Sequence, residues 1–427
     1  MRIVAAFLLF VFSPFTVVAE PVLLDAYGYI DLERGELIKP AKILIEDGVI
    51  RSINGSQTPP DVIVVPLDNK ILLPGLMDMH VHLDLDFEAA NFGIVVTESS
   101  SEAALRGAKN AERTLMAGFT TVRNVGQVHP SLDLIDAALA RASENGWIRA
   151  PRIIPAGHMI TILGGHGDLS MAEGLSEGML ELSPEYGVVS GVDDAIKATR
   201  FQIKHGAKVI KIHATAGVMS LEDSVGAQQL SDEEMSAIIE EARRHEIPVA
   251  AHAHGTDGIK AAIRAGVTSI EHGSILDDEA IRLMKKNNVF LVPTNGLMDL
   301  IDFEKLDPRK RAKAEFVDPL ADRSLAAAIE AGVNVALGTD APLIPHGMNA
   351  YEIVKMTERG MSPLEALRSA TTVSAELIGI ENLGQIREGW HADIVGVDAN
   401  PLEDITVIQS VTFVMKAGQI VKNEHGE

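Results

Sequence analysis

The stretch PGLMDMHVHL, residues 74–83, decides the fold class of this 427-residue chain. An apolar run ends there in His80-Val81-His82, and side chains two residues apart on a strand point to the same side. Two imidazoles would therefore face one point at the end of a buried strand. Alone, a His-x-His pair fits two ordinary buried or surface histidines as well as it fits a metal site. The placement of the other polar residues has to decide between them.

Seven further apolar runs follow this one, and helix-length stretches rich in Ala, Glu, Lys and Leu separate them. This alternation is typical of repeated βα units. After the first run at 75–85, the others lie at 120–125, 152–157, 208–214, 248–254, 269–272, 289–294 and 333–340. Eight parallel strands predict an α/β fold, a (β/α)8 TIM barrel, whose active site lies at the carboxyl ends of the strands.

Both ends of the chain have a different pattern, in which short alternating strands are separated by turn signals such as Asp47-Gly48. We expect the ends to pair in a small β-sandwich built from residues 20–74 and 381–427, with the barrel at 75–380. Within the barrel, the connection 158–191 is unusually long and contains GGHGD at 164–168. Long connections in compact domains are often binding loops.

Residues 1–19 have the pattern of a secretory signal peptide, with Arg2, an apolar run and small residues before Glu20. We therefore expect a periplasmic or secreted protein with no membrane anchor after cleavage. The formal net charge is −23 and no run of Lys and Arg occurs, which argues against a nucleic-acid partner. Because the chain has no cysteine, a metal site must use His, carboxylate or modified Lys.

Polar residues stand at the ends of four more predicted strands: Lys211, His252, His272 and Asp340. The carboxyl ends of barrel strands meet at one rim, so these residues should lie beside the histidine pair. Imidazole and carboxylate suit zinc, and a lysine can join them only as a carbamate, an anionic bridge between two cations. Two such cations would hold a hydroxide and polarise a carbonyl, which is hydrolytic chemistry.

Six motifs together resemble those of the amidohydrolase superfamily: PGLMDMHVHL (74–83), GFTTVRNVG (118–126), VIKIHATAG (209–217), AHAHG (251–255), IEHG (270–273) and GTDAP (338–342). The chain is most similar to the branch of Xaa-Pro and Xaa-Arg/Lys dipeptidases, imidazolonepropionase-related amidohydrolases and ochratoxin-hydrolysing amidases. That resemblance implies a metal-dependent barrel joined to a β-sandwich, and a homo-oligomer such as an octamer.

Carried over by position, the resemblance implies two divalent metal ions, expected to be Zn²⁺. His80 and His82 would bind one ion, His252 and His272 the other, and carbamylated Lys211 would bridge them. Asp340 would ligate the first ion and act as general base toward the bridging hydroxide. Lys208, three residues before Lys211, would face the opposite side of the strand and is rejected as the bridge.

For the substrate, the resemblance assigns its terminal carboxylate to His166 and His254, although a hydrogen-bonding role beside the metals is nearly as compatible with either. His213 shares the side of Lys211 and is expected in the pocket wall or behind the ligands. Asn124 departs from the family, where Asp is usual, and this departure puts the hydrogen bonding under the first metal in question.

The predicted function is release of a C-terminal amino acid from a dipeptide or N-acyl amino acid, a small-molecule amide substrate. The resemblance allows Xaa-Pro, Xaa-Arg/Lys or ochratoxin-like aromatic amides, and the net negative charge hints at Arg or Lys. A cyclic-amide hydrolase or deaminase on the same scaffold is one alternative, disfavoured by Lys211. A non-catalytic periplasmic binding protein is another, disfavoured by the complete ligand set.

Overall fold

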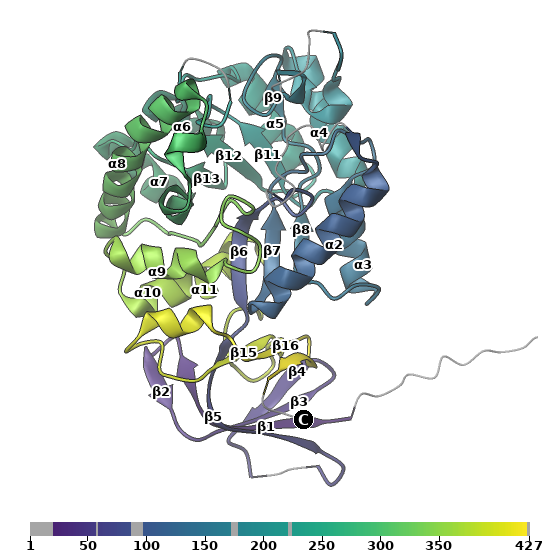
Figure 1. Ribbon diagram of the computed structural model, residues 1–427, viewed down its shortest axis with the longest axis vertical. Coiled ribbons are helices and arrows are strands. Elements are labelled where there is room, and N and C mark those ends of the chain that lie inside the picture. The colour runs from purple at the N-terminus through teal and green to yellow at the C-terminus, as the bar shows by residue number, and fades with distance from the viewer. Residues whose placement is uncertain (1–19, 57–58, 87–96, 172–177, 221–223, 425–427) are drawn as a thin grey trace, which may run out of the picture.

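The computed structural model describes residues 20–56, 59–86, 97–171, 178–220 and 224–424, so the predicted signal peptide at 1–19 lies outside the described residues (Figure 1). The described chain is an α/β protein with two groups of strands. One group lies among helices in the upper part of Figure 1, and the other forms a sheet at the bottom. None of the helices in these ranges is long and apolar enough to cross a membrane.

The two ends of the chain form one mixed sheet. Its order is β17-β16-β15-β5-β1-β3-β4, with β2 paired to β1. The strands are β1 Val22–Asp31, β2 Glu36–Ile38, β3 Ala41–Glu46, β4 Val49–Ile53, β5 Ile63–Pro74, β15 Ile394–Val397, β16 Phe413–Lys416 and β17 Gln419–Asn423. β5 and β15 run antiparallel with Leu73 opposite Val395, so the expected pairing of the two ends is observed.

The upper strands form two parallel sheets. The first contains β6 Leu76–Val81, β7 Phe119–Asn124 and β8 Arg152–Pro155. The second contains β11 Ile210–His213, β12 Val249–Ala253, β13 Ser269–His272 and β14 Phe290–Val292. All residues of β6, β7, β11, β12, β13 and β14 are buried, which explains their continuous apolar runs.

The predicted strand at 333–340 is the one that the structure does not contain as a continuous strand. Val335 makes a single parallel bridge to Leu291, and Ala341 makes another to Val81. Asp340 has a φ of 56°, which interrupts extended geometry at that point. Even so, the segment lies between β14 and β6, since the backbone N–H of Asp340 donates to His80 at 2.9 Å.

A single bridge also links the segment that follows β8 to β11. Ile160 pairs in parallel with Ile212, between the short β9 Thr161–Ile162 and the end of β8. The long connection 158–191 thus begins as a neighbour of the strand that carries Lys211. It continues through η2 Leu169–Met171, η3 Pro184–Tyr186 and β10 Val188–Val189, which pairs with β9.

Helices cover the parallel sheets on the outside (Figure 1). They are α2 Ser100–Met116, α3 Ile135–Glu144, α4 Val192–His205, α5 Asp232–Arg243, α6 Thr256–Ala265, α7 Asp278–Asn287, α8 Pro308–Ala331, α9 Ala350–Glu358, α10 Pro363–Ser369 and α11 Thr372–Leu377, with short η4 Asn295–Asp299, η5 Phe303–Lys305 and η6 Ile405–Gln409. Local sequence sets several boundaries. A Ser immediately precedes each of α2, α5 and α10. Its hydroxyl oxygen accepts from the backbone N–H of a Glu three residues later, and the Glu carboxylate accepts from the Ser backbone N–H, which is a capping box.

Candidate active site

His80, His82 and Asp340 meet where β6 ends. His80 Nε2 lies 3.4 Å and His82 Nε2 lies 3.3 Å from the same Asp340 oxygen. The Nδ1 atom of each imidazole is already engaged, with Glu271 at 2.8 Å for His80 and with the Gly126 carbonyl at 2.7 Å for His82. Both Nε2 atoms therefore face Asp340 as potential metal ligands.

His252 and His272 form the adjoining part of the cluster, with ring centroids 4.6 Å apart. Thr294 Oγ1 holds His272 Nδ1 at 2.8 Å, while the buried Nε2 of His252 has no hydrogen-bond partner in the described part of the chain. Potential ligand atoms of His80, His272 and Asp340 all lie within 4.8 Å of one another, as do those of His252, His254 and His272. A buried imidazole nitrogen without a partner is explained by a cation, so this donor set fits divalent metal.

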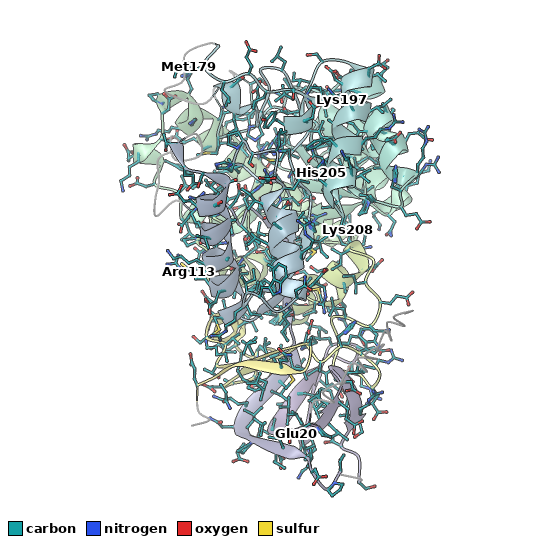
Figure 2. The ribbon with its side chains drawn as sticks, turned by 90° about the vertical axis from the view of Figure 1, so that its right-hand side faces the viewer. Glu20, Arg113, Met179, Lys197, His205 and Lys208 are labelled. Carbon is teal, nitrogen blue, oxygen red and sulfur yellow. The ribbon has the colours of Figure 1, made fainter. Side chains whose placement is uncertain are left out.

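Lys211 is buried beside this cluster, on β11, and burial lowers the pKa of its amine to about 8 despite the opposing charges of Glu271 and Asp340. An ordinary lysine has a pKa near 10.4, so far more of the Lys211 amine is neutral at pH 7. Only a neutral amine can react with carbon dioxide, and Lys211 thus fits the expected carbamate. Lys208 precedes β11 and is exposed on the outer surface, as Figure 2 shows.

Burial keeps four of the cavity histidines, His166, His252, His254 and His272, uncharged at neutral pH. Burial, reinforced by the neighbouring imidazoles, holds the pKa values of His252 and His272 well below the ordinary value. Burial lowers the pKa of both His166 and His254 to about 3. Burial alone would raise the pKa of Asp340, but His80 and His82 outweigh it and hold that pKa well below its usual range. Neutral imidazoles around an ionised carboxylate are the protonation states that metal binding requires.

Left-handed backbone conformations aim several of these side chains. His272 has a φ of 68°, Thr294 of 50° and Asp340 of 56°, each at the end of a strand or strand-like run. Such conformations cost a non-glycine residue about 1–2 kcal/mol, and the surrounding packing must impose them. At β13 the consequence is that Glu271 and His272, which are consecutive, both contact the cluster, whereas strand alternation would separate them.

Glu271 and Arg123 are functional residues that the sequence reasoning missed. Glu271 holds His80 through one oxygen and Arg123 through the other, each at 2.8 Å. Burial alone would raise the pKa of Glu271, but Arg123 and His80 lower it to about 2, so the carboxylate is ionised. The available signal was the position of both charged residues within apolar strand runs, since buried charges are almost always paired.

Asn124 supports the first part of the cluster without a charge. Its Oδ1 accepts from the Leu83 backbone N–H at 2.8 Å and its Nδ2 donates to Asp136 at 3.3 Å. Asp136 also accepts from the backbone N–H groups of Ala156 and Gly157. Burial raises the pKa of Asp136 to about 6. The departure from the family pattern therefore leaves a satisfied buried network that joins β7 to the ends of β6 and β8.

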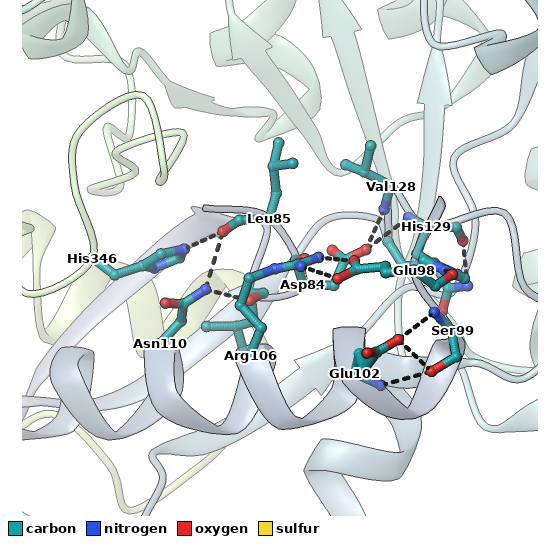
Figure 3. A network of polar contacts seen from close by, with 12 residues as sticks. Asp84, Leu85, Glu98, Ser99, Glu102, Arg106, Asn110, Val128, His129 and His346 are labelled. Atoms are coloured by element: carbon teal, nitrogen blue, oxygen red, sulfur yellow. Dashed lines mark hydrogen bonds and ion pairs between the residues drawn. The ribbon is translucent and has the colours of Figure 1, made fainter. Parts of the chain in front are cut away.

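A second network holds the segment that follows His82 (Figure 3). Asp84 Oδ2 accepts from the backbone N–H groups of Val128 and His129, both at 2.8 Å. Arg106 on α2 donates to the Asp84 carbonyl at 2.9 Å and forms an ion pair with Glu98. The carbonyl of Leu85 accepts from Asn110 at 3.1 Å and from His346 at 3.1 Å, which fixes Leu85 in the wall of the cavity.

The cluster lies at the base of a cavity of about 470 Å³. His166 and His254, the two predicted substrate residues, both line it. His254 stacks on His272 with ring centroids 4.9 Å apart, and its Nδ1 contacts Ser274 Oγ at 2.8 Å. The structure thus brings all eight predicted site residues to one cavity.

Most of the remaining wall is apolar and forms two faces. Leu85, Val128, Met159 and Leu169 pack together as one face beside the ends of β6, β7 and β8. A second apolar face comes from the segment after β11, from η4 and the residues that follow it, and from α8. It consists of Val218, Met219, Leu297, Met298, Ile301, Val317 and Ala321. A ligand seated on the cluster would therefore have apolar surface from two separate parts of the wall.

The fold and the histidine cluster define a class of metal-dependent hydrolase, and the chain belongs to the Amidohydrolase family, whose model matches residues 71–421. Members of this family typically use divalent metals, and the histidine groups described above could bind them. The resemblance found in the sequence motifs is thereby confirmed.

Among particular relatives, the chain is 35% identical to ochratoxinase of Aspergillus niger over 414 residues, 91% of this chain and 84% of that one. A solved Xaa-Pro dipeptidase with bound methionine in its active site is 35% identical, with a TM-score of 0.88 over 95% of this chain and 100% of the other. A prolidase complexed with N-methylphosphonate-L-proline is 33% identical, with a TM-score of 0.85 over 94% and 100%. These relatives indicate a TIM-barrel scaffold, in agreement with the two parallel sheets.

Proposed function

We propose that this protein is an exported binuclear-metal amide hydrolase that releases a C-terminal amino acid from dipeptides or N-acyl amino acids. The observation that carries the proposal is the joint burial of Lys211 with imidazoles whose ring nitrogens point at Asp340 or lack a partner. Relatives named for hydrolysis of ochratoxin and of Xaa-Pro dipeptides support the same reaction class.

In this proposal His80, His82 and Asp340 would hold one cation and His252 and His272 the other, and Lys211 would contribute to both as a carbamate. When bound, two cations supply Lewis acidity to the scissile carbonyl and lower the pKa of water. The Asp340 carboxylate, ionised in the site, takes a proton from the attacking water and returns it to the leaving amine nitrogen. Glu271 keeps the His80 ring in one orientation throughout.

We further infer that the two parallel sheets close into a (β/α)8 barrel through the bridges of Ile160 and of Val335 and Ala341. The mixed sheet of the chain ends is proposed as the β-sandwich of such enzymes. Because the carboxyl ends of barrel strands share one rim, closure accounts for the meeting of residues from β6, β11, β12 and β13.

The substrate's terminal carboxylate is assigned to His166 and His254. With Nδ1 of His254 accepting from the Ser274 hydroxyl, its Nε2–H is left to donate toward the cavity. Both imidazoles are neutral, so they would bind a carboxylate by hydrogen bonds and not by charge.

The two apolar faces of the cavity favour an apolar amino acid as the leaving group and an apolar acyl substituent. Asp168, an acidic residue of the described lining, already accepts from the backbone N–H of Gly164 and from Ser170. Among the substrates that the sequence left open, aromatic and proline amides therefore fit this cavity better than Arg or Lys amides.

A panel of zinc-loaded assays tests the proposal. N-acyl-phenylalanine, Xaa-Pro and Xaa-Arg dipeptides would be compared with their C-terminal carboxamides, and metal content would be measured on the same protein. Hydrolysis of the free acids with two metals per chain is expected. One metal per chain with unmodified Lys211 would favour the cyclic-amide hydrolase or deaminase instead. Binding without turnover would favour the binding protein.

Export and self-association belong to the same proposal. The signal-peptide pattern at 1–19 supports export to the periplasm or the medium, and the resemblance of the sequence motifs to the dipeptidase and amidase branch implies a homo-oligomer. N-terminal sequencing of the protein from a native host and light scattering of the purified chain measure the two properties directly.

A further inference from the structure

We propose that His213 is a positioning residue for the substrate carboxylate, and that it acts by fixing His166. The inference rests on the proposed function, because it concerns how the carboxylate-binding histidine of that site is held. His213 lies two residues after Lys211 on β11, so both side chains share one side of the strand and both line the cavity. The Nδ1–H of His213 donates to the backbone carbonyl of His166.

The other polar atoms of His166 are held as well. Its backbone N–H donates to Gln229 Oε1 at 2.9 Å, and its Nδ1 contacts Ser220 Oγ at 2.9 Å. With the carbonyl bonded to His213, only Nε2 of His166 remains for a ligand. Three separate segments thus fix one imidazole, and His213 supplies the one contact that comes from a buried strand.

Two glycines show that this arrangement is tightly built. Gly167 has a φ of +88°, and a Cβ there would lie 2.2 Å from His213 Cε1. At Gly217, a Cβ would lie 2.4 Å from His166 Cε1. The loop 164–168 lies directly on His213, and the His166 ring lies directly on the chain at Gly217. Neither ring can shift without moving the loop.

The long connection 158–191 explains why a loop histidine needs such an anchor. It joins β11 at Ile160, whose backbone N–H donates to Lys211 and whose carbonyl accepts from His213. The His213 side chain then captures the same connection a second time, six residues later, at His166. Backbone and side chain of one residue together tie the carboxylate-binding loop to the strand that carries Lys211.

A different role for His213 is metal ligation, since potential ligand atoms of His166, His213 and His252 lie within 4.8 Å of one another. The two roles differ in what His213→Leu should change. If His213 were a metal ligand, His213→Leu would bind fewer metal ions. A positioning residue would leave two metals bound and change only how the enzyme treats the carboxylate.

The experiment compares His213→Leu with His213→Asn in the zinc-loaded full chain. Asn places its Nδ2–H close to where His Nδ1–H stands, so it can still donate to the His166 carbonyl, whereas Leu cannot. The readout is the ratio of kcat/KM for an N-acyl amino acid over that for its C-terminal carboxamide, with metal content measured in parallel. For His213→Leu we expect that ratio to fall about tenfold, mainly through KM, and for His213→Asn to stay within about threefold of the parent.

A double-mutant cycle with His166→Ala shows whether His213 acts through His166. In the His166→Ala background, His213→Leu should change the acid-to-amide ratio by less than about twofold. Ser220→Ala, which frees His166 Nδ1, provides a second route to the same result and should lower the ratio in the same direction.

The proposal is overturned if His213→Leu keeps the parent ratio, if it loses a metal, or if its effect is unchanged in the His166→Ala background. These outcomes are distinct from failure of the proposed function. If the parent enzyme itself treats acid and carboxamide alike, the carboxylate assignment falls before any variant is compared.

Discussion

His80 and His272 lie in the two halves of the histidine cluster, His80 with His82 and Asp340, and His272 with His252. Their ring centroids are 5.1 Å apart, yet different chemistry orients them. His80 Nδ1 meets the carboxylate of Glu271, which is itself paired with the buried Arg123. His272 Nδ1 meets the hydroxyl of Thr294. His80 is thus oriented by buried charge, whereas His272 is oriented by a neutral hydrogen bond. Changes in the two halves should therefore differ in kind as well as in size.

The largest effect is expected at Asp340, the charged residue of the first half that would also move the proton. Asp340→Asn should lower kcat by about 10²–10⁴-fold, because the amide cannot accept the proton from water. Steady-state kinetics with matched metal content would measure this loss. Turnover within a few-fold of the parent would remove Asp340 from the mechanism.

The charged support of His80 comes next. Glu271→Gln should lower metal affinity by about 10–100-fold, as for other partners of ligating histidines. It should also destabilise the protein by about 3 kcal/mol, because Arg123 stays buried without its partner. Competition with a chelator and urea unfolding of the metal-free chain provide the two measurements.

The double variant Arg123→Gln with Glu271→Gln is the matched control for that change. It removes the unpaired charge, so it should be more stable than Glu271→Gln alone. If the double variant is less stable by the sum of two separate losses, the buried ion pair is not what supports this half.

For the second half, Thr294→Val should lower metal affinity by about tenfold or less and stability by about 1 kcal/mol, because only a neutral hydrogen bond is lost. Thr294→Ser keeps the hydroxyl and should behave as the parent. A loss for Thr294→Val as large as that for Glu271→Gln would abolish the contrast between the two halves.

Lys211 lies beside both halves of the cluster. We expect the smallest effect here, a pH dependence of the rate at which activity recovers after metal removal. Its pKa is lowered to about 8 by burial, and carbamate formation requires the neutral amine, so at constant CO2 this step becomes faster as pH rises through 8 and levels off above it. Recovery of activity after metal removal, with zinc added back at a constant concentration of dissolved CO2 between pH 6 and 9, would follow that curve. Lys208→Met should leave the curve unchanged, and a rate independent of pH would contradict a carbamate at Lys211.

How much of this site could be read from the sequence follows from the geometry of strands. Period-two alternation and the shared rim of parallel strand ends were enough to bring His80, His82, Lys211 and His252 together. They did not reveal Glu271, because alternation allows only one of the consecutive residues Glu271 and His272 to face the cluster, and the left-handed backbone of His272 brings both there. The same conformation at Asp340 accompanies the missing eighth strand.

The other contacts of the site could not be predicted because they join residues that are distant in the sequence. The contact of His213 with His166 depends on how residues 158–191 return to β11, and a helical or strand period says nothing about the path of such a loop. The role of Asn124 is hidden in the same way, because it depends on a hydrogen bond to Asp136, which lies twelve residues away on α3. The sequence could predict the residues whose positions follow from the repeated geometry of strands. It could not predict the contacts that depend on the path of a loop or on two buried side chains far apart in the chain.

The pairing of β5 with β15 also constrains the order in which the chain can fold. β5 ends at Pro74 and β6 begins at Leu76, so the strand that carries His80 starts directly beside the sheet of the chain ends. β5 lies between β1 and β15 in the sheet. During synthesis β1 is available at once, whereas β15 is complete only when Val397 has been added. Pairing of strands far apart in the sequence is slow. We therefore expect the part of the site around His80 to become rigid only after almost the whole chain is available, well after the local helices have formed.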